Sequence, residues 1–220
     1  ACAEHMRSHH MAVSDQAYPE HWLAQIPIPD RSMALDRSGP GRHQPLEPML
    51  QALGRLAALG ATTIAVACNT AHAWHGQLQA RFPQLEVLHV AHEVAVLLAA
   101  RGAGKIGLLA TEGTYRTGMY EQALHQAGVQ CCTPDAKDRE LLMRGIYQGV
   151  KVGNLPLARQ CFSEAAHSVA RQHGVRTLVM GCTEIPLGLG RPENLDGLEL
   201  IDPALLLARA LALRAYGVSA

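Results

Sequence analysis

Two stretches of the chain share one pattern: Thr63-Ile64-Ala65-Val66-Ala67-Cys68-Asn69-Thr70 and Thr177-Leu178-Val179-Met180-Gly181-Cys182-Thr183-Glu184. Each begins with an apolar, β-branched run free of charge, which is typical of a strand buried on both faces of a parallel sheet. Each ends in a small residue, a cysteine and two polar residues, where the strand should give way to a turn or a helix. The repetition favours two similar halves.

The rest of the chain alternates short apolar runs with helical patterns. Strands are expected at residues 21–27, 62–67, 86–90, 105–110, 176–180 and 198–201. Helices are expected at residues 46–59, 71–81, 93–101, 115–127, 138–149, 155–173 and 203–216. Strands that alternate with helices of this length predict an α/β fold with parallel sheets. We therefore predict two similar α/β domains, related by a pseudo-twofold axis, with a ligand cleft between them.

The domain boundaries follow from this alternation. We expect an N-terminal domain at residues 1–100 and a C-terminal domain at residues 101–202, with residues 203–220 packing back on the first domain. Gly60 and Gly102 are predicted helix stops, and Pro203 follows Asp202 as a first-turn proline.

Composition narrows the class of protein. The 220 residues are 48% hydrophobic and 17% charged, with a formal net charge of zero, so nucleic acid is not an expected partner. No apolar run reaches membrane-spanning length, and the N-terminus has no apolar signal-peptide core. These features predict a cytoplasmic protein with no membrane partner.

Cysteine and histidine spacing argues against a metal site. None of the six cysteines forms a CxxC pair, and in a reducing compartment they are expected to be free thiols. Cys2, Cys131, Cys132 and Cys161 are interpreted as small buried hydrophobes. The paired histidines, His72 with His75 and His89 with His92, make no HExxH pattern and lack an obvious third ligand.

Cys68 and Cys182 are the strongest candidates for chemistry. Both lie where a predicted strand ends, and ligands of open α/β sheets bind beyond those ends. Backbone N–H groups at a following helix start favour an anion, and a cysteine there can have its pKa pulled below about 8.5. One such cysteine is weak support, whereas two in matching contexts indicate a shared site.

With these motifs in place, the chain resembles the aspartate/glutamate racemase family, most closely its aspartate racemase branch. Segments 67–72 and 181–186 are similar to the paired cysteine signatures of that family. Segments 108–115, 27–31 and 149–154 resemble further family segments, and the similarity runs from about Ser14 to Pro203.

The resemblance implies racemisation at an amino-acid α-carbon without a cofactor. One cysteine, as thiolate, removes the α-proton while the other, as thiol, protonates the opposite face. Each sulfur must approach Cα to roughly 3–3.5 Å, so the sulfurs should stand about 7 Å apart. Relatives are commonly homodimers, so a homodimer is expected.

The resemblance also implies roles for the polar residues near the cysteines. It assigns hydrogen bonds to the substrate's amino and carboxylate groups to a set of short polar side chains: Asn69, Thr70, Thr111, Thr114 and Thr183. Glu184 could accept the thiol proton or orient a neighbour. Arg31 and Lys151 are expected to hold a side-chain carboxylate, which favours aspartate.

One departure from the family leaves alternatives open. The usual first strand and glycine-rich loop are not found, and residues 1–11 are interpreted as the remainder of a first helix. A shortened chain, an inactive remnant that only binds ligand, and completion of the sheet by another chain are all consistent with this. A sister reaction on a dicarboxylate such as maleate is a further alternative.

Overall fold

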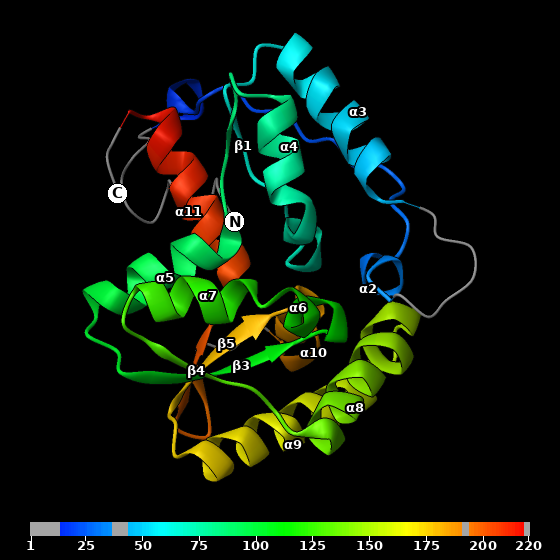
Figure 1. Cartoon of the computed structure of the whole chain (residues 1–220), viewed down its shortest axis with the longest axis vertical. Coiled ribbons are helices and arrows are strands. Elements are labelled where there is room, and N and C mark those ends of the chain that lie inside the picture. Colours follow the sequence, from blue (N-terminus) through cyan, green and yellow to red (C-terminus); the bar gives the residue numbers. More distant parts are fainter. Residues whose placement is uncertain (1–13, 37–43, 191–193, 218–220) are drawn as a thin grey trace.

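The structure is a computed structural model that describes residues 14–36, 44–190 and 194–217. The helix expected at residues 1–11 lies outside these ranges. The elements run in chain order as η1 (Asp15–Ala17), α2 (Arg31–Ala34), α3 (Leu46–Ala58), β1 (Thr63–Ile64), η2 (Thr70–Trp74), α4 (His75–Arg81), β2 (Glu86–Val87), α5 (Val90–Ala100), β3 (Lys105–Ala110), α6 (Glu112–Thr117), α7 (Met119–Gln126), β4 (Gln130–Cys132), α8 (Ala136–Arg144), η3 (Gly145–Gly149), η4 (Val150–Val152), α9 (Leu155–His173), β5 (Thr177–Gly181), α10 (Glu184–Leu189), β6 (Asn194–Leu195), β7 (Leu198–Ile201) and α11 (Pro203–Ala215) (Figure 1).

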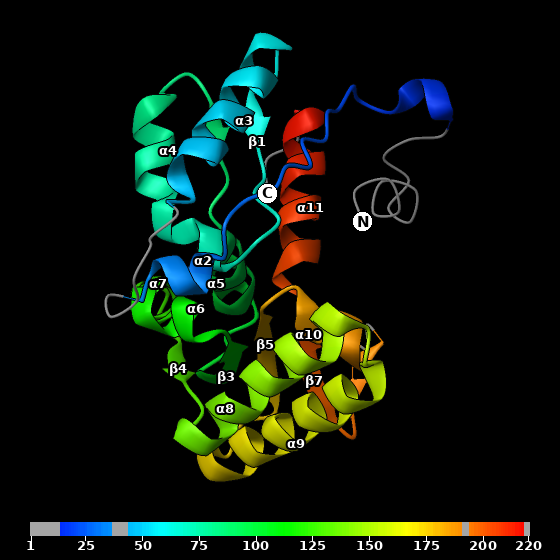
Figure 2. The same cartoon turned by 90° about the vertical axis from the view of Figure 1, so that its right-hand side faces the viewer.

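A five-stranded sheet forms the larger part of the fold. Its order is β4-β3-β5-β7-β6, and all neighbours pair in parallel except β6 with β7. Successive side chains of β3 point to opposite faces: Leu108 packs with α5, α7 and α11, whereas Leu109 packs with α8 and α9. Figure 2 shows α8 and α9 lying together over one side of these strands. Burial on both faces explains why the central strands β3 and β5 are almost entirely apolar.

The smaller part contains a two-stranded parallel sheet. Thr63 of β1 pairs with Glu86 of β2, and α3 and α4 cover the pair through a core that includes Leu53 and Leu78. The predicted strand at 62–67 is therefore shorter than expected. The chain leaves the ladder in a turn, where the N–H of Cys68 donates to the carbonyl of Val66 at 2.8 Å.

The strand predicted at 21–27 is wrong, since residues 19–30 form no helix or strand. This segment has no strand beside it to complete a hydrogen-bonded ladder, and Leu23 is 86% exposed. The short strands β4 and β6 were not predicted.

The predicted helices lie where they were expected, but some of them are not continuous. The expected helix at 115–127 is divided into α6 and α7 at Gly118, whose φ of 63° suits glycine. The expected helix at 138–149 continues from α8 into the π-helical turn η3. Pro203 lies in the first turn of α11 as predicted, and Asp202 caps this helix by accepting from the N–H of Ala204 at 2.9 Å.

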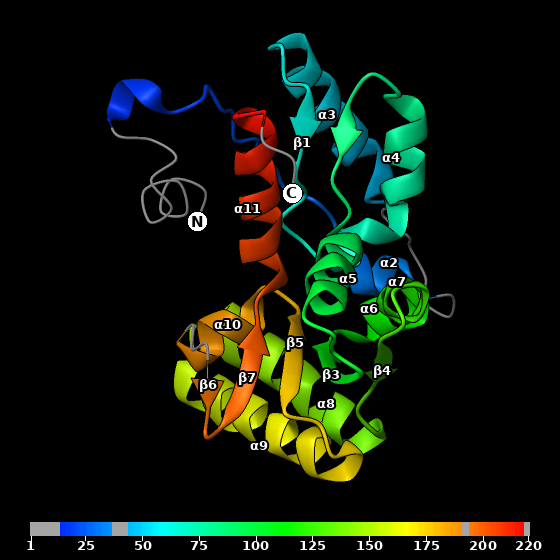
Figure 3. The same cartoon turned by 90° about the vertical axis from the view of Figure 1, so that its left-hand side faces the viewer.

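Helix α11 returns from the larger sheet to the smaller part, where Figures 1 and 3 show it beside β1. It packs on α5, and Arg214 forms an ion pair with Glu86 of β2 at 3.1 Å. The domain boundaries, and the packing of residues 203–220 on the first domain, stay predictions. The helices described by the structure include no candidate membrane-spanning segment.

Candidate active site

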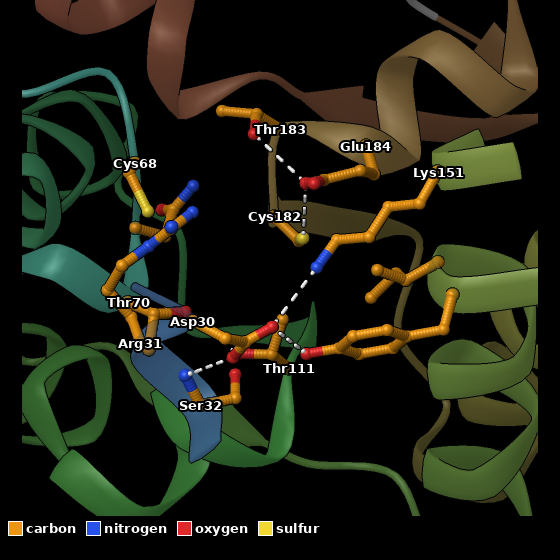
Figure 4. Close-up of a pocket in the computed structure, with 13 residues that line it drawn as sticks. Asp30, Arg31, Ser32, Cys68, Thr70, Thr111, Lys151, Cys182, Thr183 and Glu184 are labelled. Atoms are coloured by element: carbon orange, nitrogen blue, oxygen red, sulfur yellow. Dashed lines mark hydrogen bonds and ion pairs between the residues drawn. The ribbon is translucent and has the colours of Figure 1, made fainter. Parts of the chain in front are cut away.

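A narrow pocket lies where the carboxyl ends of β1, β3 and β5 meet, the edge at which parallel α/β sheets bind ligands. Its lining comes from both parts of the fold and consists of Asp30, Arg31, Ser32, Cys68, Asn69, Thr70, Thr111, Ile146, Tyr147, Lys151, Cys182, Thr183 and Glu184. The sequence predicted nine of these as site residues. Figure 4 shows the sulfurs of Cys68 and Cys182 pointing into the same space from opposite sides.

Cys182 is held as a thiol. It directly follows β5, is 5% exposed, and its Sγ donates to Oε2 of Glu184 at 3.0 Å. Thr183 Oγ1 donates to the same oxygen at 3.0 Å, which fixes the carboxylate. Burial, followed by the charge of Glu184, raises the pKa of Cys182 well above its ordinary value. The lowered pKa expected from the helix start is therefore wrong for this cysteine.

Cys68 has a cation as its neighbour. The guanidinium of Arg31 points toward the Cys68 sulfur (Figure 4), while its Nη1 donates to the carbonyls of Ile28 and Pro29 at 3.2 and 3.3 Å. Burial alone would lower the pKa of Arg31. The Cys68 sulfur, and to a smaller extent Asp30 and Glu184, outweigh burial and raise this pKa overall. Arg31 therefore places a fixed positive charge beside the sulfur of Cys68.

Asp30 forms an ion pair with Lys151 in the wall of the pocket, a contact that was not predicted from the sequence. Its carboxylate caps α2 by accepting from the N–H groups of Ser32 and Met33 at 2.9 and 3.0 Å. Its other oxygen accepts from Tyr147 Oη at 2.7 Å and from Lys151 Nζ at 3.3 Å. Burial opposes ionisation, but these bonds and the lysine charge lower the pKa of Asp30 overall. Lys151 also lies 3.9 Å from the centre of the Tyr147 ring.

Three buried threonine hydroxyls form a second group. Thr70 Oγ1 lies 2.9 Å from Thr111 Oγ1 and 3.1 Å from Thr114 Oγ1, and Thr111 Oγ1 accepts from the N–H of Thr114 at 3.1 Å. Thr70 and Thr111 line the pocket, whereas Thr114 is fully buried behind them. Thr114 therefore orients the other two hydroxyls and is not placed to contact a ligand.

The residues that the sequence missed had weak local signals. Asp30 directly precedes Arg31, and Tyr147 lies four residues before Lys151, a spacing that places two side chains on one helical face. That spacing could have indicated Tyr147. Nothing near Ile146 in the sequence marks it as a lining residue.

The histidines cluster without forming a metal centre. The rings of His72, His75 and His89 have centroids 4.7 to 6.0 Å apart. Burial first, and then the neighbouring rings, lower the pKa of His72 to about 3 and that of His89 to about 4. Within the part of the chain that the structure describes, no three histidine, cysteine or acidic side chains are arranged to hold a metal ion. Its five cysteines are free thiols.

Comparison with known proteins identifies the family. The model of the Asp/Glu/Hydantoin racemase family matches residues 1–211. Glutamate racemase of Desulforudis audaxviator is 32% identical over 166 residues, which is 73% of this chain and 59% of that protein. Picrophilus torridus aspartate racemase superposes with a TM-score of 0.76 at 27% identity, covering 98% of this chain and 87% of that one. An aspartate racemase homologue from Pyrococcus horikoshii OT3 superposes with a TM-score of 0.64 at 26% identity, covering 77% and 73%.

The chain belongs to the Asp/Glu/hydantoin racemase family. The predicted α/β class with parallel sheets is confirmed by the described strands and by these superpositions. The chain spans 59% of the length of each of two glutamate racemases that it matches.

Proposed function

We propose that this chain interconverts L- and D-aspartate by two-base proton transfer at the α-carbon, with Cys68 and Cys182 as the bases and no cofactor. One observation carries the proposal: the two cysteines lie beside charged groups of opposite sign. Cys68 lies beside the Arg31 guanidinium, whereas Cys182 donates to the Glu184 carboxylate. One sulfur therefore faces a positive charge and the other donates to a negative one, an asymmetry that suits a base and an acid on opposite faces of the α-carbon.

The proton balance of the proposed reaction is simple. The Cys68 thiolate removes the α-proton. The electron pair of the broken C–H bond stays on Cα, where the α-carboxylate delocalises it. The Cys182 thiol then delivers its proton to the opposite face of Cα. The products are the inverted amino acid, a Cys68 thiol and a Cys182 thiolate, and the opposite enantiomer reverses each step. Hydrogen-bond donors in a dry pocket stabilise the carbanion, and the Thr70 and Thr111 hydroxyls line that pocket.

Two cations in the lining support a dicarboxylate substrate. Arg31 and Lys151 both border the pocket, and Lys151 already holds a carboxylate oxygen, that of Asp30. A substrate side-chain carboxylate could compete for this ammonium group. The relatives named as aspartate racemases favour aspartate, whereas the sequence relatives named as glutamate racemases make glutamate the second candidate.

A substrate panel tests the choice of substrate. Lys151→Met should raise KM by about 10- to 100-fold for aspartate, because a hydrogen bond between charged groups is lost. It should change KM for alanine far less. Lys105→Met, which removes an exposed lysine bonded to the carbonyl of His173, is the matched control. Equal losses for aspartate and alanine would refute the role of Lys151, and faster turnover of glutamate than of aspartate would overturn the substrate assignment.

The homodimer and the cytoplasmic location remain predictions.

A dicarboxylate isomerase that uses cysteine as a nucleophile is distinguished by mass spectrometry, since it would form a covalent adduct with maleate. The proposed racemase forms none.

A further inference from the structure

Tyr120 is a fully buried tyrosine whose hydroxyl reaches a residue of the pocket. It lies on α7 with 0% exposure, and its Oη donates to Oδ1 of Asn69 at 2.5 Å. Burial, followed by the charge of Asp202, raises the pKa of Tyr120 well above its ordinary value. The hydroxyl therefore keeps its proton and remains a donor.

This bond determines which end of the Asn69 amide is available to a ligand. Asn69 is 4% exposed and lines the pocket. Among the described residues no group is hydrogen-bonded to Nδ2, so the N–H groups are the unbonded end of the amide in a residue that lines the pocket.

We propose that Tyr120 is a positioning residue that holds the Asn69 amide in the one orientation that offers N–H donors, and no acceptor, to the substrate's α-carboxylate. The inference rests on the proposed racemase function. An amide free to flip would also present its carbonyl oxygen, and that oxygen repels a carboxylate and suits an ammonium group instead. Charge on the α-carboxylate increases as the α-proton leaves, so a fixed donor stabilises the transition state more than the ground state.

A double-mutant cycle tests this coupling. Tyr120→Phe keeps the ring and removes the hydroxyl, and should lower kcat/KM for α-proton exchange by about tenfold, mostly through kcat. In an Asn69→Ala background the same substitution should cost less than about twofold, because its target is gone. Equal losses in the two backgrounds would overturn the proposal.

Tyr115→Phe is the matched control. Tyr115 is also a buried tyrosine, but its hydroxyl donates to the carbonyl of Leu108 and accepts from the N–H of Ala110, both in the backbone of β3. Its removal should lower thermal stability and should have the same effect on kcat/KM with or without Asn69.

A second readout does not depend on turnover. The side-chain ¹⁵N–¹H signals of Asn69, assigned by their absence in Asn69→Ala, should shift in Tyr120→Phe and stay unchanged in Tyr115→Phe. Unchanged signals in Tyr120→Phe would overturn the positioning role. If the unaltered chain exchanges no amino-acid α-proton, the proposed function fails, while these signals still decide whether Tyr120 orients Asn69.

Discussion

At the scale of single residues, the two cysteines differ more than their matching sequence contexts suggest. Both follow strands of the same pattern, yet Arg31 faces one sulfur and Glu184 faces the other. The difference arises because Arg31 comes from a segment distant in the sequence, whereas Glu184 lies two residues after Cys182. The resting site is therefore polarised across the pocket.

Glu184→Gln tests this polarisation. The substitution removes the carboxylate charge, so the pKa of Cys182 should fall, while burial still holds it above its ordinary value. Cys182 must be ionised to remove an α-proton, so in that direction the rising limb of the pH–rate profile should move to lower pH. Initial rates of deuterium exchange from each enantiomer measure the profile. A limb that stays in place or moves to higher pH contradicts the assigned charge effect.

Part of the site could be predicted residue by residue from the sequence. Cys68, Cys182, Arg31 and Lys151 were predicted because each lies in a recognisable motif, and all four line one pocket. Asp30 and Tyr147 were missed because their role depends on a contact 117 residues apart in the chain. Thr114 was assigned to the substrate, although a motif does not reveal that its hydroxyl is turned toward Thr70 and Thr111.

At the scale of elements, hydrogen bonds from histidine rings to backbone carbonyls hold the short segment between β1 and α4. His72 Nε2 lies 3.2 Å from the carbonyl oxygen of Val66, two residues before Cys68, and His75 Nε2 lies 2.7 Å from that of Val87 in β2. The other titratable rings near His72 are those of His75 and His89, and His92 faces His89. The chain carrying Cys68 is thus built on a cluster that acid should disrupt.

The fold should accordingly lose stability in mild acid. The pKa of His72 is lowered by burial from its ordinary value of 6.5 to about 3 in the folded chain, so the unfolded chain binds the proton more tightly. This contribution is fully present above about pH 6.5 and is lost as pH falls toward 3. At about pH 4.5 one such histidine costs about 2–3 kcal/mol. Urea unfolding of the unaltered chain and of His72→Gln measures it, and equal pH slopes for the two would contradict the prediction.

The ends of the strands were harder to predict than those of the helices, because they depend on which residues find a ladder partner. Residues 62–67 and 21–27 have similar apolar character, but only Thr63 and Ile64 find ladder partners, in β2. Pairing is a tertiary property, so composition alone does not fix where a strand ends. Helix ends were more predictable where a local signal marks them, as Asp202 and Pro203 do at the start of α11.

At the scale of the whole molecule, α11 connects the two parts of the fold. Leu207 is 3% exposed within the core shared by α5, β3 and α7, whereas Leu205 on the same helix is 50% exposed. Leu207→Ala should lower the free energy of unfolding by about 2–5 kcal/mol, and Leu205→Ala should change it by less than about 0.5 kcal/mol. Thermal and urea unfolding measure both, and equal effects would show that α11 does not carry this core.

Deuterium incorporation in D₂O, without added cofactor, tests the proposed chemistry as a whole. L-aspartate and D-aspartate are incubated separately with the unaltered chain, Cys68→Ala and Cys182→Ala, and followed by proton NMR and chiral analysis. The unaltered chain should exchange the α-proton of both enantiomers and invert them, and each variant should lose inversion by at least about 100-fold. Full inversion by either variant, or no exchange by the unaltered folded chain, would contradict a two-base racemase.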